Sequence, residues 1–245
     1  MIDLLKDIVS HTYNLGYLEV VRITGEEEST KIDSMADDRS VIMYGEFNKP
    51  VDEMQGVFGM PQLNKLKLHL DCPEYKENAK IDLVRAERNG NVIPVGLHFE
   101  NEASDFKNDY RFMDTGVINE KLKTVKFRGV NWNVTINPNI AAIQRFQLQA
   151  AANSEHSTFL TVTDGTNLKF IFGDQSTHGG EFVFATDVTG KLSKAWTWPV
   201  SQVLAILKIS DVNNTTMSIS DEGAMQITLD SGIATYQYII PAQTK

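Results

Sequence analysis

The sequence predicts an α+β protein made of two similar halves, and three observations support this. Segments with helical spacing of apolar residues are each followed by several strand-like segments, and this pattern occurs four times along the 245 residues. Four helices cannot cover both faces of so many strands, so we expect them on one side of antiparallel sheets. A stretch without a clear period separates the halves. We therefore predict a first domain at residues 1–114, a connector at 115–127 and a second domain at 128–245.

In the first half we expect two helices among six strands. The helix at residues 2–12 is amphipathic, and the helix at 61–70 begins with a proline and carries Leu63, Leu66 and Leu70 as one apolar stripe. Asn89-Gly90 predicts a tight hairpin between the strands on either side. The expected strands are 17–24, 30–34, 39–47, 80–88, 92–101 and 106–113.

The second half repeats this pattern. Helices are expected at residues 138–152 and from Trp198-Pro199 to about Ser210, the latter with Val200, Val203 and Leu207 among its apolar stripe. The expected strands are 131–136, 158–163, 167–173, 181–188, 216–220, 224–230 and 233–240.

Composition narrows the possible classes of protein. A hydrophobic fraction of 42% with 22% charged residues is ordinary for a globular chain with a core. The single cysteine, Cys72, excludes an intrachain disulfide and a cysteine-based metal cluster, which favours a reducing compartment. Asp3, Lys6 and Asp7 interrupt the apolar residues of the N-terminal segment, so we expect no signal peptide or membrane span there and a cytoplasmic location.

No motif indicates an enzyme. The sequence has no nucleophile elbow, dinucleotide-binding or phosphate-binding glycine loop, zinc-protease motif or calcium-binding loop, and its five histidines are scattered. Residues 177–180 (THGG) resemble an oxyanion loop only loosely, and a turn between strands is the favoured interpretation. The acidic pair Asp37-Asp38 is better explained as solvated loop charge. We predict no catalytic residue, no metal and no cofactor.

The positions of the basic residues are more informative. The net charge of −9 argues against nucleic acid unless charge is segregated on the surface. Every expected helix carries at least one cation, and others cluster near the connector and before the last helix. They are Lys6, Lys65, Lys67, Arg145 and Lys208 on helices, Lys121, Lys123, Lys126 and Arg128 near the connector, and Lys191 and Lys194 before the last helix. If all four helices face one common surface, that surface is basic and would contact DNA phosphates without reading bases. The alternative is that these lysines and arginines simply belong to ordinary polar helix faces.

Three short segments resemble DNA sliding clamps of the kind that T-even-like bacteriophages encode, which are related in fold to the eukaryotic and archaeal proliferating-cell clamps. The segment 32–41 (IDSMADDRSV) is similar to a serine-methionine-aspartate turn that leads into a strand of these clamps. The segment 109–114 (DYRFMD) resembles their last strand of the first domain, and 233–242 (IATYQYIIPA) resembles their closing strand.

The resemblance implies two clamp domains per chain and a homotrimer that forms a pseudo-six-fold ring with its helices around the hole. Such a ring encircles duplex DNA and tethers the replicative DNA polymerase, without enzymatic activity, after a separate clamp loader has placed it. The location would be the cytoplasm of an infected bacterial host. The DNA-facing residues would be Lys6, Lys65, Lys67, Lys121, Lys123, Arg145, Lys191, Lys194 and Lys208.

The resemblance also implies two protein-binding surfaces. A pocket for partner peptides would be lined by Met35, Val41, Val117, Ile118 and Pro241. The subunit contact would join strand 106–113 of one chain to strand 182–188 of the next, with Phe106, Tyr110, Phe112, Phe182 and Phe184 as its aromatic residues. The main alternative is a ring-forming, β-rich phage tail or baseplate protein, and a hydrolase comes third because no nucleophile with a base is visible.

Overall fold

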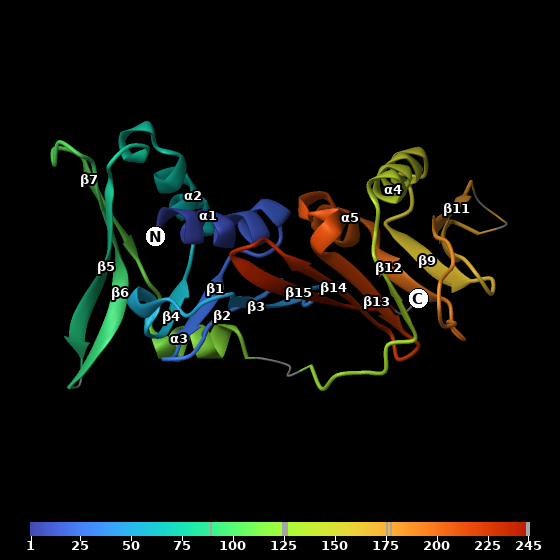
Figure 1. Cartoon of the computed structure of the whole chain (residues 1–245), viewed down its shortest axis with the longest axis horizontal. Helices are drawn as coiled ribbons and strands as arrows, with labels where there is room; N and C mark the ends of the chain where they lie inside the picture. The colour runs from blue at the N-terminus through green and yellow to red at the C-terminus, as the bar shows by residue number, and fades with distance from the viewer. Residues whose placement is uncertain (89, 124–126, 175, 177, 244–245) are drawn as a thin grey trace. The chain divides into compact units, whose positions relative to one another are not determined.

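The computed structural model describes residues 1–88, 90–123, 127–174, 176 and 178–243. The chain divides into two compact units, Met1–Val125 with Gly232–Tyr236, and Lys126–Ser231 with Gln237–Lys245. Each unit consists of a few helices packed on antiparallel sheets (Figure 1), which confirms the predicted α+β fold class.

The first unit contains a four-stranded run and a separate three-stranded sheet. The strand orders are β4-β1-β2-β3 and β5-β6-β7. The helices are α1 (Ile2–His11), α2 (Leu63–Asp71) and α3 (Thr115–Lys121), with short 3₁₀ turns at Tyr13–Leu15, Asp52–Met54 and Pro73–Tyr75; the strands are β1 (Val21–Gly25), β2 (Thr30–Met35), β3 (Ile42–Phe47), β4 (Gly56–Met60), β5 (Lys80–Arg88), β6 (Asn91–Glu100) and β7 (Lys107–Arg111).

The second unit also has two sheet regions, ordered β11-β10-β9-β12 and β15-β14-β13-β8. The helices are α4 (Ile140–Ala152) and α5 (Val200–Ile209), with a 3₁₀ turn at Val212–Asn214; the strands are β8 (Val134–Ile136), β9 (Thr158–Thr163), β10 (Leu168–Phe172), β11 (Gly180–Ala185), β12 (Trp196–Pro199), β13 (Thr215–Ser220), β14 (Ala224–Asp230) and β15 (Ala234–Pro241). The first residues of β15, up to Tyr236, belong to the first unit.

The two units repeat one order of elements. In the first, α1 is followed by β1 to β4, then α2, then β5 to β7; in the second, α4 is followed by β9 to β12, then α5, then β13 to β15. The four-stranded orders β4-β1-β2-β3 and β12-β9-β10-β11 also correspond strand by strand. The predicted internal repeat is therefore present in the topology as well as in the sequence pattern.

Two strands and one α-helix were not predicted. The strands β4 and β12 each directly precede the second helix of their unit, and helix α3 occupies the first seven residues of the expected connector. Asp114 caps α3, because its carboxylate accepts a hydrogen bond from the backbone N–H of Gly116 (2.9 Å). The two strands joined at the predicted Asn89-Gly90 turn do pair, although Asn89 itself lies outside the described residues.

The second unit is built around a cluster of phenylalanines. Phe146 of α4 lies within 4.9 Å of Phe159 and 5.3 Å of Phe170, measured between ring centroids. Phe184 of β11 stacks on Phe170 at 4.2 Å. Buried aromatic pairs of this kind contribute more than their buried area alone. The cluster therefore fixes α4 against β9, β10 and β11.

Candidate nucleic-acid interface and partner surfaces

One face of the four-stranded run in the first unit is covered by α1. The buried Tyr236 side chain donates a hydrogen bond from its hydroxyl to Asp7 Oδ2 of α1 (2.7 Å), and its ring stacks on His11 at 4.4 Å. A Cβ at Gly45 would touch both Tyr236 and Ile32, so these residues share that face of the sheet. Helix α1 packs against α2, which lies on the same side (Figure 1).

Helices α1 and α2 turn cationic residues to the surface. Lys6 and Lys65 are exposed, and Lys67 is partly exposed. The ammonium group of Lys67 forms an ion pair with Asp71 one turn later. The three lysines predicted to face DNA from α1 and α2 therefore lie on one helical layer, and one of them is already paired.

Helix α3 lies on the opposite face of the same sheet (Figure 1). Side chains alternate along β1, so Arg22 points away from the face that buries Val21 and Ile23. The Arg22 guanidinium donates to Asp33 Oδ2 (3.1 Å from Nε) and to Asn119 Oδ1 of α3 (3.3 Å). Buried Ile118 packs in the same layer with Val20 and Leu122.

Two of the lysines predicted to face DNA belong to this part of the unit, and their role stays a prediction. Lys121 ends α3, and Lys123 follows two residues later. Both are exposed, and Lys121 lines a pocket together with Leu63 and Asn64 at the start of α2. The sequence placed them in an irregular connector, and without α3 there was no signal for which face they occupy. Of the same predicted cluster, Lys126 lies outside the described residues.

In the second unit, two of the predicted DNA-facing residues are exposed on helices, and two others lie in a loop apart from those helices. Arg145 of α4 and Lys208 of α5 are exposed. Lys191 and Lys194 lie before β12, whose far end leads into α5. The backbone N–H groups of Ser193 and Lys194 donate to Asp221 at the end of β13 (2.9 and 3.2 Å).

Asp221 follows the end of β13 remote from α5, so the loop that carries Lys191 and Lys194 lies at the strand ends away from that helix. The prediction that these two lysines face DNA together with the helical cations stays a prediction. Lys194 instead lies 5.6 Å above the ring of Trp196.

The residues of the predicted peptide pocket differ in their exposure, and the pocket stays a prediction. Met35 and Ile118 do meet in one cluster, but Ile118 and Val41 are fully buried, so they pack the interior instead of lining an open cavity. Val117 is 54% exposed on the outer side of α3. Pro241 is exposed and belongs to the second unit. At this position the first unit exposes the outer side of α3.

The strands predicted to join subunits lie at sheet edges. Strand β7 is the last strand of β5-β6-β7, and β11 is the last strand of β11-β10-β9-β12. An edge strand presents backbone groups that another chain can pair with. The aromatic side chains are not equally available, however: Tyr110 and Phe184 are buried, whereas Phe106 is 41% exposed.

Two of these aromatic residues instead anchor β7 within its own unit. The Tyr110 hydroxyl donates to the carbonyl of Pro61, and burial raises the pKa of Tyr110. Phe112 stacks on Phe58 at 4.3 Å. The remaining pair, Phe182 and Phe184, belongs to the aromatic cluster around Phe146. A subunit contact here would therefore depend mainly on backbone pairing and not on these rings.

The outer face of β5-β6-β7 carries a charged network that sequence analysis missed. His98 on β6 lies opposite Asp82 on β5 and Asp109 on β7. His98 Nδ1 is 2.8 Å from Asp109 Oδ1, and this hydrogen bond raises the pKa of His98 and lowers that of Asp109. The next exposed row consists of Lys80, Glu100 and Lys107.

Glu100 is held in its charged form by this row. Lys107 Nζ lies 2.9 Å from Glu100 Oε2, and Ser104 donates its hydroxyl to the same carboxylate. These hydrogen bonds, that of Ser104 first, lower the pKa of Glu100 to about 2. The alternating charges could have been found only with the register of the three strands, because the residues are far apart in sequence.

Among the described residues, no group of three or more histidine, cysteine or carboxylate side chains has the geometry to hold a metal ion. Within the same residues, no helix is long and apolar enough to cross a membrane.

Comparison with known proteins gives a structural match without a sequence match. No protein-family model matches the chain, and no curated protein matches it either. A chain in the solved structure described as the C-terminal region of FEN-1 bound to A. fulgidus PCNA matches with a TM-score of 0.71 and 12% identity, over 100% of this chain and 97% of that one.

PCNA from Thermococcus kodakaraensis matches with a TM-score of 0.68 and 13% identity, over 98% of this chain and 97% of that one. The likeness extends over nearly the full length of both chains, whereas the identity is low. The chain has the fold of the archaeal PCNA sliding clamps.

Proposed function

We propose that this protein is a DNA sliding clamp, a non-enzymatic processivity factor that encircles duplex DNA and keeps a replicative polymerase near the primer end. The observation that supports this best is the full-length structural likeness to two archaeal PCNA chains, with TM-scores of 0.71 and 0.68. The repeated order of helices and strands in the two units agrees with it.

The proposed assembly is a homotrimer of the T-even phage type, acting in the cytoplasm of an infected bacterial host and loaded by a separate clamp loader. Three chains of two units each would give six similar units, which suits a closed cyclic ring with head-to-tail contacts. The edge positions of β7 and β11 support a contact in which β7 of one chain pairs with β11 of the next.

The proposed DNA-facing residues are those on α1, α2, α4 and α5: Lys6, Lys65, Lys67, Arg145 and Lys208. Lysine and arginine on a helical layer would touch phosphates without reading bases. Because a closed ring cannot leave a circular duplex without opening, these contacts can be weak and still permit long residence. The functional gain is a high effective concentration of the tethered polymerase at its substrate.

The proposed partner surface is the exposed side of α3, with Val117 at its centre. One of the two structural neighbours is described as bound to the C-terminal region of another protein, FEN-1, which supports peptide binding as a property of this fold. We propose the polymerase as the principal partner at this surface.

Two measurements test the proposal: the mass of the assembly in solution and its retention on circular compared with linear DNA. Light-scattering chromatography at several concentrations should give three times the subunit mass of 27.5 kDa, with dissociation on dilution. The protein is then incubated with a nicked circular plasmid, cross-linked through its lysines and washed at high salt. Retention on the circle and release after the plasmid is linearised would support the clamp.

Two results would contradict the proposal. A strict monomer at high concentration, or an assembly of six or more chains, would exclude the trimeric ring and favour a phage structural protein. Equal retention on circular and linear DNA would indicate ordinary binding without encirclement. The same plasmid incubated with protein that was cross-linked beforehand is the matched control, because a ring closed in advance cannot thread onto a circle.

A further inference from the structure

Strand β7, the proposed subunit edge, is held to its own sheet by charges as well as by backbone hydrogen bonds. Lys107 Nζ lies 2.9 Å from Glu100 Oε2, and Asp109 Oδ1 lies 2.8 Å from His98 Nδ1. Arg111, the last residue of the strand, reaches Asp109 at 3.8 Å. Of these three contacts, that of Asp109 with His98 is the one whose charge changes near neutral pH.

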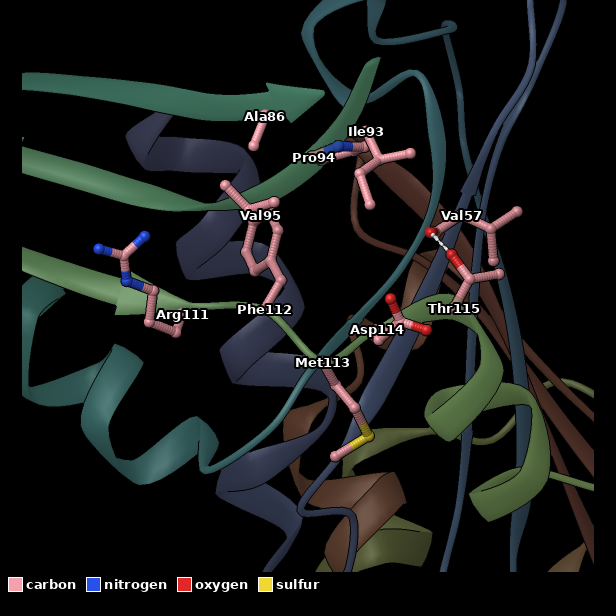
Figure 2. Close-up of a pocket in the computed structure, with 10 residues that line it drawn as sticks. All are labelled: Val57, Ala86, Ile93, Pro94, Val95, Arg111, Phe112, Met113, Asp114 and Thr115. Carbon is pink, nitrogen blue, oxygen red and sulfur yellow. Dashed lines mark hydrogen bonds between the residues drawn. The ribbon is translucent and has the colours of Figure 1, made fainter. Parts of the chain in front are cut away.

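The far end of β7 is anchored to other strands of the same unit. Figure 2 shows Phe112 and Thr115 on the segment that continues β7 toward α3. The Thr115 hydroxyl donates to the carbonyl of Val57 (2.6 Å), the contact drawn in the figure, and the backbone N–H of Phe112 donates to the carbonyl of Val95 (3.0 Å). With this end fixed, the open edge from residue 107 to 111 is the part that a second chain would pair with.

Three carboxylates surround His98 on the outer face of the sheet. Asp82 on β5 and Asp109 on β7 lie opposite it, and Glu100 on its own strand is 3.6 Å from its Nε2. A proton on His98 therefore places a positive charge among carboxylates, whereas a neutral imidazole offers Asp109 at most a hydrogen bond. The cations that pair with these carboxylates are Lys80, Lys107 and Arg111.

A second chain on β7 would make this pair more important. The side chain of Asp109 is 48% exposed in the single chain, and that of His98 is 32% exposed. Covering the edge removes water from both groups, which strengthens the attraction between opposite charges and raises the free energy of an unpaired carboxylate.

The strand proposed to join β7 would bring a further carboxylate. Phe182 and Phe184 on β11 point toward Phe146 of α4, so the alternation of side chains turns Glu181 to the face away from that helix. Glu181 lies 3.8 Å from Lys169 of β10 on this face. An assembled contact would thus gather more negative charge around His98 than the single chain does.

We propose that His98 is a pH-sensitive switch of the subunit contact, which is tight while the imidazole carries its proton and loosens when the proton leaves. The inference rests on the proposed function, because it uses the contact of β7 with a second copy of this chain. The hydrogen bond to Asp109 already raises the pKa of His98 in the single chain, and association raises it further. The added stability of the contact is therefore fully present below the pKa of the single chain and is lost as the pH rises through the higher value in the ring.

Sedimentation equilibrium of the full chain at pH 6.0, 7.0 and 8.5, at constant ionic strength, measures this switch. An exposed charge pair changes one contact by roughly two- to fivefold, and a closed ring has three such contacts. We therefore expect the trimer association constant to fall by roughly ten- to a hundredfold between pH 6.0 and 8.5. His98→Gln should remove most of this pH dependence, and Asp109→Asn should reduce it, because each takes away one partner of the pair.

The matched control is His156→Gln. His156 Nε2 lies 2.7 Å from the carbonyl of His178, two residues before β11, so it is a rival source of pH dependence at the other edge strand. The control should keep the native pH dependence. A pH dependence that survives in His98→Gln, or one that disappears in His156→Gln, would overturn the proposal.

Dilution calorimetry of the native chain tests the switch without any substitution. Because dissociation should release protons, the heats measured at pH 7.5 in phosphate and in Tris buffer should differ. Equal heats in the two buffers would overturn the proposal.

The switch and the clamp function fail in distinguishable ways. A trimer that is retained on circular DNA but dissociates equally at pH 6.0 and 8.5 would overturn the switch alone. A monomer at every pH and concentration would overturn the ring and the switch together.

Discussion

Tyr236 connects the last strand of the chain to its first helix through a single buried hydroxyl. Its hydrogen bond to Asp7 Oδ2 is 2.7 Å long, and the Tyr236 side chain is fully buried. Tyr236→Phe removes the donor while keeping the ring stacked on His11. We expect the free energy of unfolding to fall by about 1–3 kcal/mol, the usual effect of removing one partner of a buried hydrogen bond. Urea denaturation measures this.

The control for this change is Tyr13→Phe, because Tyr13 is partly exposed near the start of the same unit. Surface changes of this kind usually alter stability by less than about 0.5 kcal/mol. Equal stability of the two variants would show that the bond between Tyr236 and Asp7 contributes nothing.

Gly59 is the residue that sets the distance between α3 and β4. In Gly59→Ala, the new methyl group would lie within 2.9 Å of both Ile118 and Met113, so the helix must move away from the strand. Overpacking of this kind costs about 1–3 kcal/mol. Gly116→Ala on α3 itself is the control, since its Cβ would meet only Asp114 Oδ1 at 3.4 Å. We expect Gly116→Ala to be neutral or slightly stabilising in thermal unfolding, because alanine favours helix more than glycine does.

At the scale of the element, the three-stranded sheet β5-β6-β7 should respond to pH through His98. Its pKa is raised, first by the hydrogen bond to Asp109 and further by Glu100, so the folded state binds the proton more tightly than the unfolded chain. The stabilisation is therefore complete below the unfolded pKa of about 6.5 and is lost as the pH rises through the higher folded value. The lowered pKa values of Asp109 and Glu100 give stability the opposite pH dependence. Their contributions are present at neutral pH and are lost as the pH falls into the acid range.

His69 provides the control for this pH dependence. Burial lowers its pKa, with the charge of Lys65 adding to the effect, so it stabilises the fold above about pH 6.5 and less as the pH falls. Relative to the native chain, His98→Gln should lose most stability at pH 6, and His69→Gln should lose most at pH 8. Unfolding by urea across this range tests the pair. Parallel profiles for the two variants would contradict the assignment.

The elements that the sequence predicted well are those with a strong period or a clear turn. Strands β5, β9 and β14 agree with the predicted bounds, because turn residues flank them. Strand β4 was missed because Gly56 and Gly59 lower its strand propensity, although Gly59 is needed for the approach of α3. Strand β12 was missed because Trp198-Pro199 resembles the start of a helix.

The candidate site was predicted less completely than the fold, for a physical reason. Lys121 could be identified as basic, but its face of the sheet depends on α3, whose formation depends on the Asp114 cap and on the burial of Ile118. Likewise, the partnership of His98 with Asp109 requires the register of β6 and β7. Composition and periodicity carry no information about such long-range contacts.

At the scale of the whole molecule, the proposed ring has two sets of cationic residues. One set would face DNA and the other would not, although each lysine or arginine contributes equally to the net charge of the chain. The first set, on α1, α2, α4 and α5, is Lys6, Lys65, Arg145 and Lys208; the second, at the end of α3 and just after it, is Lys121 with Lys123. Replacing Lys6 and Lys65 by glutamate should weaken DNA binding and make it less dependent on salt. The logarithmic salt slope should fall by about 0.9 for each phosphate that the variant no longer neutralises. Arg145 and Lys208 are replaced in a second variant.

The control variant replaces Lys121 and Lys123 by glutamate, which changes the net charge of the chain by the same amount as each helical pair. If the helices face the duplex, the control should keep the native salt slope, while both helical variants should show a smaller one. Retention of a cross-linked trimer on circular DNA should survive in all three, because encirclement does not require phosphate contacts. A reduced salt slope in the control, with unchanged slopes in the helical variants, would place DNA on the α3 side and require a different binding surface.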